Sequence, residues 1–175
     1  MLPVFTIGHS TRSIEAFVDL LRAGAVNLVV DIRTVPRSRT NPQFNPDALA
    51  PALADCQIAH TRIAALGGLR KASASVPPEV NAFWTNRSFH NYADYALSDA
   101  FRAGLAELGG LAAEARCAIM CAEAVWWRCH RRIVADYLLA AGGEVFHLMG
   151  GDRVEPARLT PAAVPAADGL HYPKI

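Results

Sequence analysis

Residues 116–123, RCAIMCAE, decide the fold class. This run is apolar and shows no alternation with polar positions, which is typical of a strand buried on both faces of a parallel sheet. The following segment, CHRRIVADYLLAAGG at 129–143, has the amphipathic spacing of a helix and ends in glycines. A buried strand followed closely by a helix predicts one βα unit of an α/β protein.

The same alternation extends outward in both directions. Short apolar or β-branched runs predict further strands at 4–8, 26–32, 58–63 and 144–149. Helical spacing predicts helices at 10–24, 46–56 and 92–115, the last being either one helix or two helices with a break at Gly109-Gly110. Residues 70–91 have no clear period and predict a long loop. The pattern predicts a three-layer, doubly wound, mostly parallel sheet of about five strands, Rossmann-like or flavodoxin-like.

The chain length of 175 residues fits one domain with a hydrophobic core. We expect a single α/β domain over 1–150 and an irregular, proline-rich extension over 151–175 that packs on it. The amino terminus has no basic, apolar signal pattern, and no apolar run reaches the ~20 residues of a membrane span. The four cysteines do not have the spacing of a secreted disulfide framework. We therefore expect a soluble, cytoplasmic protein with free thiols and no membrane partner.

The charge balance limits the classes of partner. The net charge is +1, so nothing in the overall charge favours nucleic acid or an acidic membrane surface. The basic residues are nevertheless almost all arginine, the side chain best suited to bidentate contacts with carboxylate and phosphate. Codon usage in a GC-rich genome would explain that skew, but not the positions of particular arginines.

Chemically capable side chains follow nearly every predicted strand. In open α/β sheets, ligands bind outside the carboxyl ends of the strands, so topology alone should bring these residues together. The candidates, in chain order, are His9, Ser10, Asp31, Arg33, Arg39, Gly67, Gly68, Cys121, Glu123, Cys129, His130 and Arg131.

The motifs that carry these residues resemble a known family. TIGHSTR, DIRTVPRSRTNPQF, LGG, SFHNYADY, MCAEAVWWRCHRR and VFHL occur in this order. Together they resemble the bacterial and archaeal family DUF488, a domain of unknown function, over roughly residues 4–149. The resemblance implies an α/β fold and a shared set of polar residues, and it implies no established reaction, so function must be argued from the residues.

Three chemical interpretations of the cysteines compete. Cys121 or Cys129 is a thiolate nucleophile, activated by the adjacent helix amino terminus, with His130 or His9 as base. Alternatively, both cysteines and one histidine (His9, His130 or His147) bind zinc or iron, although the spacing matches no standard metal motif and nearby arginines disfavour a cation. In the third interpretation the two cysteines form a redox pair.

The same residues also have purely structural explanations. Cys121 would be a small core residue, Glu123 would pair with an arginine, and His130 and Arg131 would cap and pack the helix. Trp126 and Trp127 would form a lid over the site, an interface, or part of the core. The sequence does not decide among these alternatives.

The remaining candidates belong to the turns after the first three strands. His9 and Asp31 are expected to move or orient protons, or else to fix the turn by bonding to each other. Arg33 binds substrate in one interpretation and pairs internally with Asp31 in the other. Ser10 is expected to cap the first helix more readily than to act on substrate, and Gly67 and Gly68 to form a tight turn more readily than a phosphate cradle.

The prediction is an enzyme that acts on a small phosphorylated or nucleotide-like anion. Cys121, Glu123, Cys129, His130, His9 and Asp31 would perform the chemistry, and Ser10, Arg33, Arg39, Arg131, Gly67 and Gly68 would bind the substrate. The alternatives are a non-catalytic module that binds nucleotide or nucleic acid, and a Cys/His metal-binding protein. The sequence predicts no particular cofactor and no oligomeric state.

Overall fold

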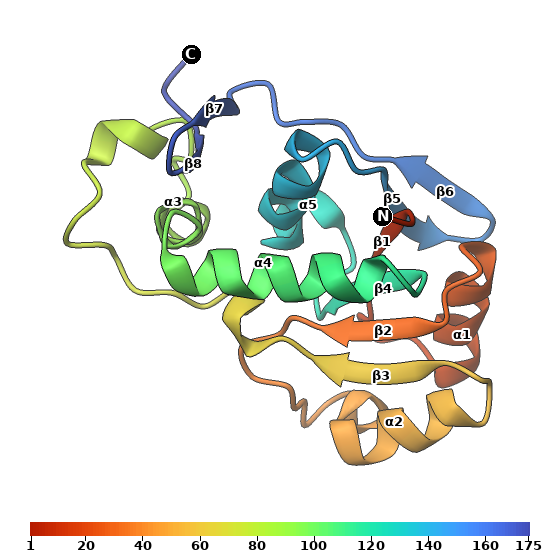
Figure 1. Cartoon of the computed structure of the whole chain (residues 1–175). Helices are drawn as coiled ribbons and strands as arrows, with labels where there is room; N and C mark the ends of the chain where they lie inside the picture. Colours follow the sequence, from red (N-terminus) through yellow and green to blue (C-terminus); the bar gives the residue numbers. More distant parts are fainter.

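The computed structural model describes residues 1–175 and contains a six-stranded sheet with five α-helices. The strands are β1 (Val4–Gly8), β2 (Leu28–Asp31), β3 (Ala59–Arg62), β4 (Cys117–Cys121), β5 (Val145–Gly150) and β6 (Arg153–Pro156), in the order β3-β2-β4-β1-β5-β6. The five strands β1 to β5 pair in parallel, and β6 pairs antiparallel to β5. The α/β class with a mostly parallel sheet is therefore confirmed (Figure 1).

The helices are α1 (Ile14–Ala23), α2 (Pro46–Ala54), α3 (Arg87–Tyr95), α4 (Asp99–Ala112) and α5 (Arg131–Ala140). None of them is long and apolar enough to cross a membrane. The strand order is neither 3-2-1-4-5-6 nor 2-1-3-4-5, the orders of the Rossmann and flavodoxin sheets. The three-layer, doubly wound arrangement remains a prediction.

Two buried clusters divide the core by the pleat of the strands. Because successive side chains point to opposite faces, alternate residues of one strand enter different clusters. Ala118 and Met120 of β4 pack with α1 and α2, whereas Cys117 and Ile119 pack with α4 and α5. Both faces of β4 are therefore buried, which explains why its sequence is apolar without alternation.

The predicted break of the last helical region at Gly109-Gly110 was wrong. Gly109 and Gly110 lie inside α4, and the helical region breaks instead around Ser98, whose hydroxyl accepts a hydrogen bond from the backbone N–H of Phe101 and caps α4. Buried Leu108 anchors the glycine-containing turn, so packing outweighs the roughly 1 kcal/mol propensity cost of each glycine.

The segment 151–175 is more regular than the expected irregular extension. Besides β6 it forms the hairpin β7 (Val164–Ala166) and β8 (Gly169–His171). Buried Leu170 and Tyr172 join the core cluster of α4 and α5, and the Tyr172 hydroxyl donates a hydrogen bond to Asp136 of α5. Burial of these side chains holds the segment against the rest of the chain.

Parallel pairing places the strand ends together. Gly8 of β1 pairs in register with Cys121 of β4, and Asp31 of β2 pairs with Met120 of β4. The residues that follow these strands therefore emerge at one edge of the sheet, which is where the sequence placed the candidate site.

Candidate functional site

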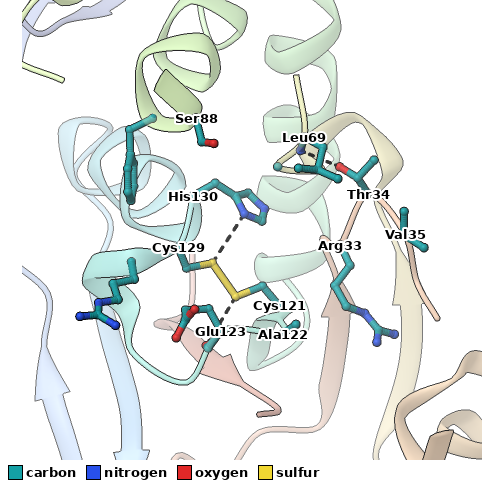
Figure 2. Close-up of a pocket in the computed structure, with 13 residues that line it drawn as sticks. Arg33, Thr34, Val35, Leu69, Ser88, Cys121, Ala122, Glu123, Cys129 and His130 are labelled. Carbon is teal, nitrogen blue, oxygen red and sulfur yellow. Dashed lines mark hydrogen bonds between the residues drawn. A yellow bond between two sulfur atoms is a disulfide. The ribbon is translucent and has the colours of Figure 1, made fainter. Parts of the chain in front are cut away.

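Two of the four cysteines are joined at this edge. Cys121 ends β4, and a 3₁₀ turn at Trp126–Arg128 returns the chain so that Cys129 meets it in a disulfide (Figure 2). The expectation of free thiols is therefore wrong for this pair and holds for Cys56 and Cys117. Both bonded cysteines are nearly inaccessible, at 3% and 4% exposed, yet they line a cavity of about 300 Å³. A bond between them favours interpretations in which the two sulfurs act together.

Trp126 holds the turn that brings the cysteines together. Its indole stacks on His147 of β5, with ring centroids 4.6 Å apart, and the guanidinium of Arg132 lies 5.6 Å from its centre. Trp127 is 46% exposed. The first tryptophan is thus a packing residue, and only the second is free to contact anything outside.

Arg131 supplies a buried positive charge next to Cys121. Its side chain is 0% exposed, and Nη1 donates to Cys121 Sγ at 2.6 Å and to the backbone oxygen of Glu123 at 2.7 Å. Nη2 donates to the oxygen of Ala124 at 3.1 Å, and Nε has no partner. No carboxylate forms a salt bridge with this guanidinium.

Burial makes that charge costly. It lowers the pKa of Arg131 to about 9, while the charge of Glu123 opposes the shift and that of Arg12 adds to it. A buried ion is stable only when a counter-charge and hydrogen bonds compensate its desolvation. Hydrogen bonds to two carbonyl oxygens and to Cys121 Sγ compensate part of the desolvation. A thiolate at Cys121 would supply the counter-charge.

His130 is oriented so that one ring nitrogen faces Cys129. Its Nε2 lies 2.9 Å from the backbone oxygen of Ile32, and a carbonyl can only accept, so Nε2 carries the proton. Burial lowers the pKa of His130 to about 4, against the favourable bond to Ile32, so the imidazole is neutral near pH 7. The lone pair is then on Nδ1, 3.5 Å from Cys129 Sγ.

Gly68 is the residue that admits this ring. A Cβ at Gly68 would lie 2.5 Å from His130 Nδ1, closer than non-bonded atoms approach. A Cβ at Gly67 would similarly meet Thr34 Oγ1 at 2.7 Å. The two glycines therefore serve close packing, and Gly68 also lines the cavity, whereas the proposed binding of substrate by their backbone stays a prediction.

We expect Gly68→Ala to destabilise the protein by about 1–3 kcal/mol, because an overpacked side chain must displace its neighbour. Gly109→Ala is the matched control, since a Cβ there meets nothing within 4 Å. In α4 that change should instead stabilise by about 0.5–1 kcal/mol. Urea unfolding of both variants measures the difference. Equal effects of the two substitutions would contradict this role of Gly68.

Asp31, Arg33 and His9 form a buried network beside the cysteines. The carboxylate of Asp31 is 0% exposed and accepts bonds from the backbone N–H, Nε and Nη2 of Arg33, the shortest at 2.7 Å. Arg33 Nη2 also donates to the oxygen of Phe44, and Nη1 lies 3.3 Å from His9 Nε2. The charge of Arg33 is thus largely used within the protein, although the residue also lines the cavity.

His9 is held in one tautomer by these contacts. Its Nδ1 lies 2.8 Å from the backbone oxygen of Ser10 and therefore donates, which leaves Nε2 to accept from Arg33. Burial, opposed by the bond to Ser10, lowers the pKa of His9. The ring also stacks on Phe44 at 4.5 Å. His9 therefore packs in the turn through Ser10, Arg33 and Phe44, and the expected direct bond between His9 and Asp31 is replaced by one through Arg33.

The other candidates are less closely tied to the sulfurs. The side chain of Glu123 is exposed at the rim and pairs with no arginine. Arg39 lies exposed in the loop after β2 and lines neither cavity at this edge. Ser10 does not cap α1; Ser13 does, by accepting from the N–H of Ala16. Ser10 instead adopts a left-handed backbone with φ of 49°.

A second cavity adjoins the first. It has a volume of about 440 Å³, and it shares Arg33, Val35, Ala122 and Glu123 with the cavity at the cysteines. Its other lining residues are largely polar: His9, Ser10, Thr11, Ala124, Arg37, Ser38, Thr40 and Asn41. The edge of the sheet therefore offers a continuous surface, and the cysteine pair lines one of its two cavities.

Several residues around the cysteines were not among the predicted site residues. Arg128 lines the cavity and is exposed, and it takes part in no salt bridge. Val35 and Leu69, which are 60% and 70% exposed, form part of an apolar rim with Phe89. Arg128 could have been predicted, because it directly precedes Cys129 and His130 in the sequence. The apolar rim could not, because Val35 and Leu69 lie in loops without a sequence pattern.

The metal interpretation finds no geometric support. No group of three or more Cys, His, Asp or Glu side chains is arranged to hold a metal ion. The two sulfurs are bonded to each other, and His147 lies inside the sheet with Nδ1 2.7 Å from the hydroxyl of Thr6. Nδ1 of His147 is thus engaged by Thr6 and its ring by Trp126, and His147 belongs to no group arranged to hold a metal ion.

Acidification should destabilise the fold through its buried histidines. Burial, with added repulsion from Arg131, lowers the pKa of His147 to about 3, and that of His130 is about 4. Unfolded histidines titrate near 6.5, so below that pH the unfolded chain binds more protons and the free energy of unfolding falls. The loss should continue from pH ~6.5 down to ~3.

Urea unfolding at several pH values measures this loss. His147→Gln should reduce the slope of unfolding free energy against pH in this window, because one titrating group is removed. An unchanged slope would contradict the assignment.

Comparison with known proteins gives a family and no reaction. The family model described as domain of unknown function DUF488 matches residues 13–138. No curated protein matches the chain. No solved structure matches it either.

Proposed function

The chain belongs to the DUF488 family, and we propose that it is an enzyme whose nucleophile is the thiolate of Cys121, acting on a small anion. The observation that carries the proposal is the guanidinium of Arg131, which is fully buried, forms no salt bridge with a carboxylate and lies 2.6 Å from Cys121 Sγ. In the disulfide neither sulfur is charged. Reduction would allow a thiolate to form there and neutralise the cation.

The surroundings of Cys121 suit a reactive thiolate. Thiolates, and not thiols, are nucleophiles, and a neighbouring arginine favours the charged form. Cys121 also lines the cavity, with exposed Arg128 at the rim. Arg128 is positioned to attract an anionic substrate, whereas Arg33 is mainly occupied by Asp31. Of the predicted arginines, Arg131 therefore serves the sulfur and not the substrate.

The substrate remains the less defined part of the proposal. The cavity of about 300 Å³ matches a small molecule, and the cations at its edge favour negative charge. Hydroxyl and amide side chains in the adjoining cavity would suit a phosphorylated or nucleotide-like group. His130 is the group placed to move a proton near the sulfurs, and Asp31 and His9 position Arg33.

Alkylation of the reduced protein across a range of pH tests this function. Reduced chains are treated with iodoacetamide, and the rate at each cysteine is measured by peptide mass spectrometry. We expect Cys121 to react fastest and to remain reactive well below pH ~8.5, where ordinary thiols are protonated. Cys121→Ser should remove the fast reaction.

A non-catalytic binding module, the alternative from another class, predicts a different result. It would use the same arginines with four slowly reacting thiols. Slow alkylation of all four cysteines at neutral pH would contradict the proposed enzyme, and salt-dependent binding of oligonucleotides would then support the module.

A further inference from the structure

The neighbour of the nucleophile is a second thiol with its own proton acceptor. Cys129 Sγ lies bonded to Cys121 Sγ and 3.5 Å from the unprotonated Nδ1 of His130. The backbone N–H of Arg131 also points to Cys129 Sγ, at 3.4 Å. Each sulfur thus has a different partner: a guanidinium at Cys121 and an imidazole at Cys129.

From this arrangement, and resting on the proposed function, we infer that the enzyme reduces small anionic disulfides. In the first step the thiolate of Cys121 attacks one sulfur of the substrate R–S–S–R. An S–S bond forms between Cys121 and R–S, and the other half leaves as R–S⁻. The substrate bond breaks without any other reactant.

In the second step Cys129 attacks Cys121 Sγ. The proton of the Cys129 thiol passes to His130 Nδ1 and on to solvent, the Cys121–Cys129 disulfide forms, and the second R–S⁻ leaves. The substrate has gained two electrons, and the two cysteines have lost two. An external dithiol, by thiol–disulfide exchange, returns the pair to the reduced state.

The geometry favours this sequence over one-step chemistry. Because the two sulfurs are held side by side, the second attack is intramolecular and occurs at high effective concentration. Any adduct on Cys121 that has a good leaving group is therefore exposed to Cys129. A disulfide substrate gives that leaving group directly. The apolar rim of Val35, Leu69 and Phe89 beside Arg128 suits a substrate that is partly apolar and negatively charged.

Dithiobis(nitrobenzoic acid), an anionic aromatic disulfide with a coloured leaving group, is the probe for this inference. Cys56→Ser serves as the background, because Cys56 is partly exposed. Cys117 is fully buried, and burial raises the pKa of its thiol to about 11, so it should stay silent. The reduced background protein should release two coloured thiolates per chain from one reagent molecule, keep no adduct, and contain the Cys121–Cys129 disulfide.

Two further variants separate the steps. Adding Cys129→Ser should leave the first release fast, stop the second, and trap the adduct on Cys121. His130→Gln should slow the second release tenfold or more, since glutamine can keep the donor to Ile32 but lacks the Nδ1 acceptor. His130→Asn should slow it as well, because a carboxamide cannot take up the proton of the Cys129 thiol.

The outcomes distinguish failure of the proposed disulfide reductase from failure of the proposed Cys121 nucleophile. A fast first release with a lasting adduct in the background protein, or two separate adducts, overturns the reductase and leaves the Cys121 nucleophile standing. Absence of a fast first release overturns both.

Discussion

Asp31→Asn should lower the free energy of unfolding by about 3–5 kcal/mol, because it leaves a buried charge without its partner. The carboxylate of Asp31 and the guanidinium of Arg33 are 0% and 5% exposed and lie 2.7 Å apart. Three groups of Arg33 donate to that carboxylate, and an amide would replace the charged acceptor by a neutral one. Urea denaturation of wild type and variant gives the difference.

An exposed ion pair is the matched control for this prediction. Asp47 pairs with Arg37 at 3.7 Å with both side chains more than half exposed. Such pairs contribute about 0–1 kcal/mol, so Asp47→Asn should have little effect. The double change Asp31→Leu with Arg33→Met should recover part of the loss, since no charge is then buried. A loss at Asp31 no larger than at Asp47 would show that the buried pair is not needed for stability.

The second large effect is expected at Arg131. Replacing it with Met should slow alkylation of Cys121 near pH 6.5 by about tenfold to a thousandfold, because an adjacent opposite charge favours the ionised form by about 1–3 pKa units. The rates are compared in reduced protein that also carries Cys56→Ser. At alkaline pH, where the thiol ionises unaided, the two proteins should converge.

Arg131→Lys tests whether charge or shape matters. Lysine keeps the positive charge but not the planar fork that reaches the Glu123 and Ala124 carbonyls. Part of the reactivity should therefore survive in this variant. Equal alkylation rates in wild type and the Met variant at acidic pH would show that Arg131 does not stabilise the thiolate, even if the fold is intact.

The fold could be predicted from the sequence where local pattern and burial agree. The runs at 4–8 and 116–123 gave strands close to β1 and β4, and the parallel sheet followed from their alternation with helices. The break around Ser98 and the strands after residue 150 were missed. In both cases long-range packing, of Leu108 and of Tyr172, decided a structure that local propensity did not.

The candidate site could be located but not detailed. The position of the site at one edge of the sheet could be predicted, because parallel strands place their carboxyl ends at the same edge. The burial of Arg131 had a signal that was overlooked: Ala135 and Leu138 follow it by four and seven positions, so it lies on the buried face of α5. The meeting of Cys121 with Cys129, and the tautomer of His130, depend on the turn at Trp126–Arg128 and on Ile32, which no local pattern reveals.

Ultraviolet titration of the thiolate tests the central claim most directly. The protein carries Cys56→Ser and Cys129→Ser, so that Cys121 and silent Cys117 are the remaining thiols. Thiolate absorbance should already be present at neutral pH, should disappear on acidification, and should be absent at neutral pH when Cys121→Ser is added. Absorbance that develops only at or above pH ~8.5, as for an ordinary cysteine, would contradict a thiolate stabilised by Arg131.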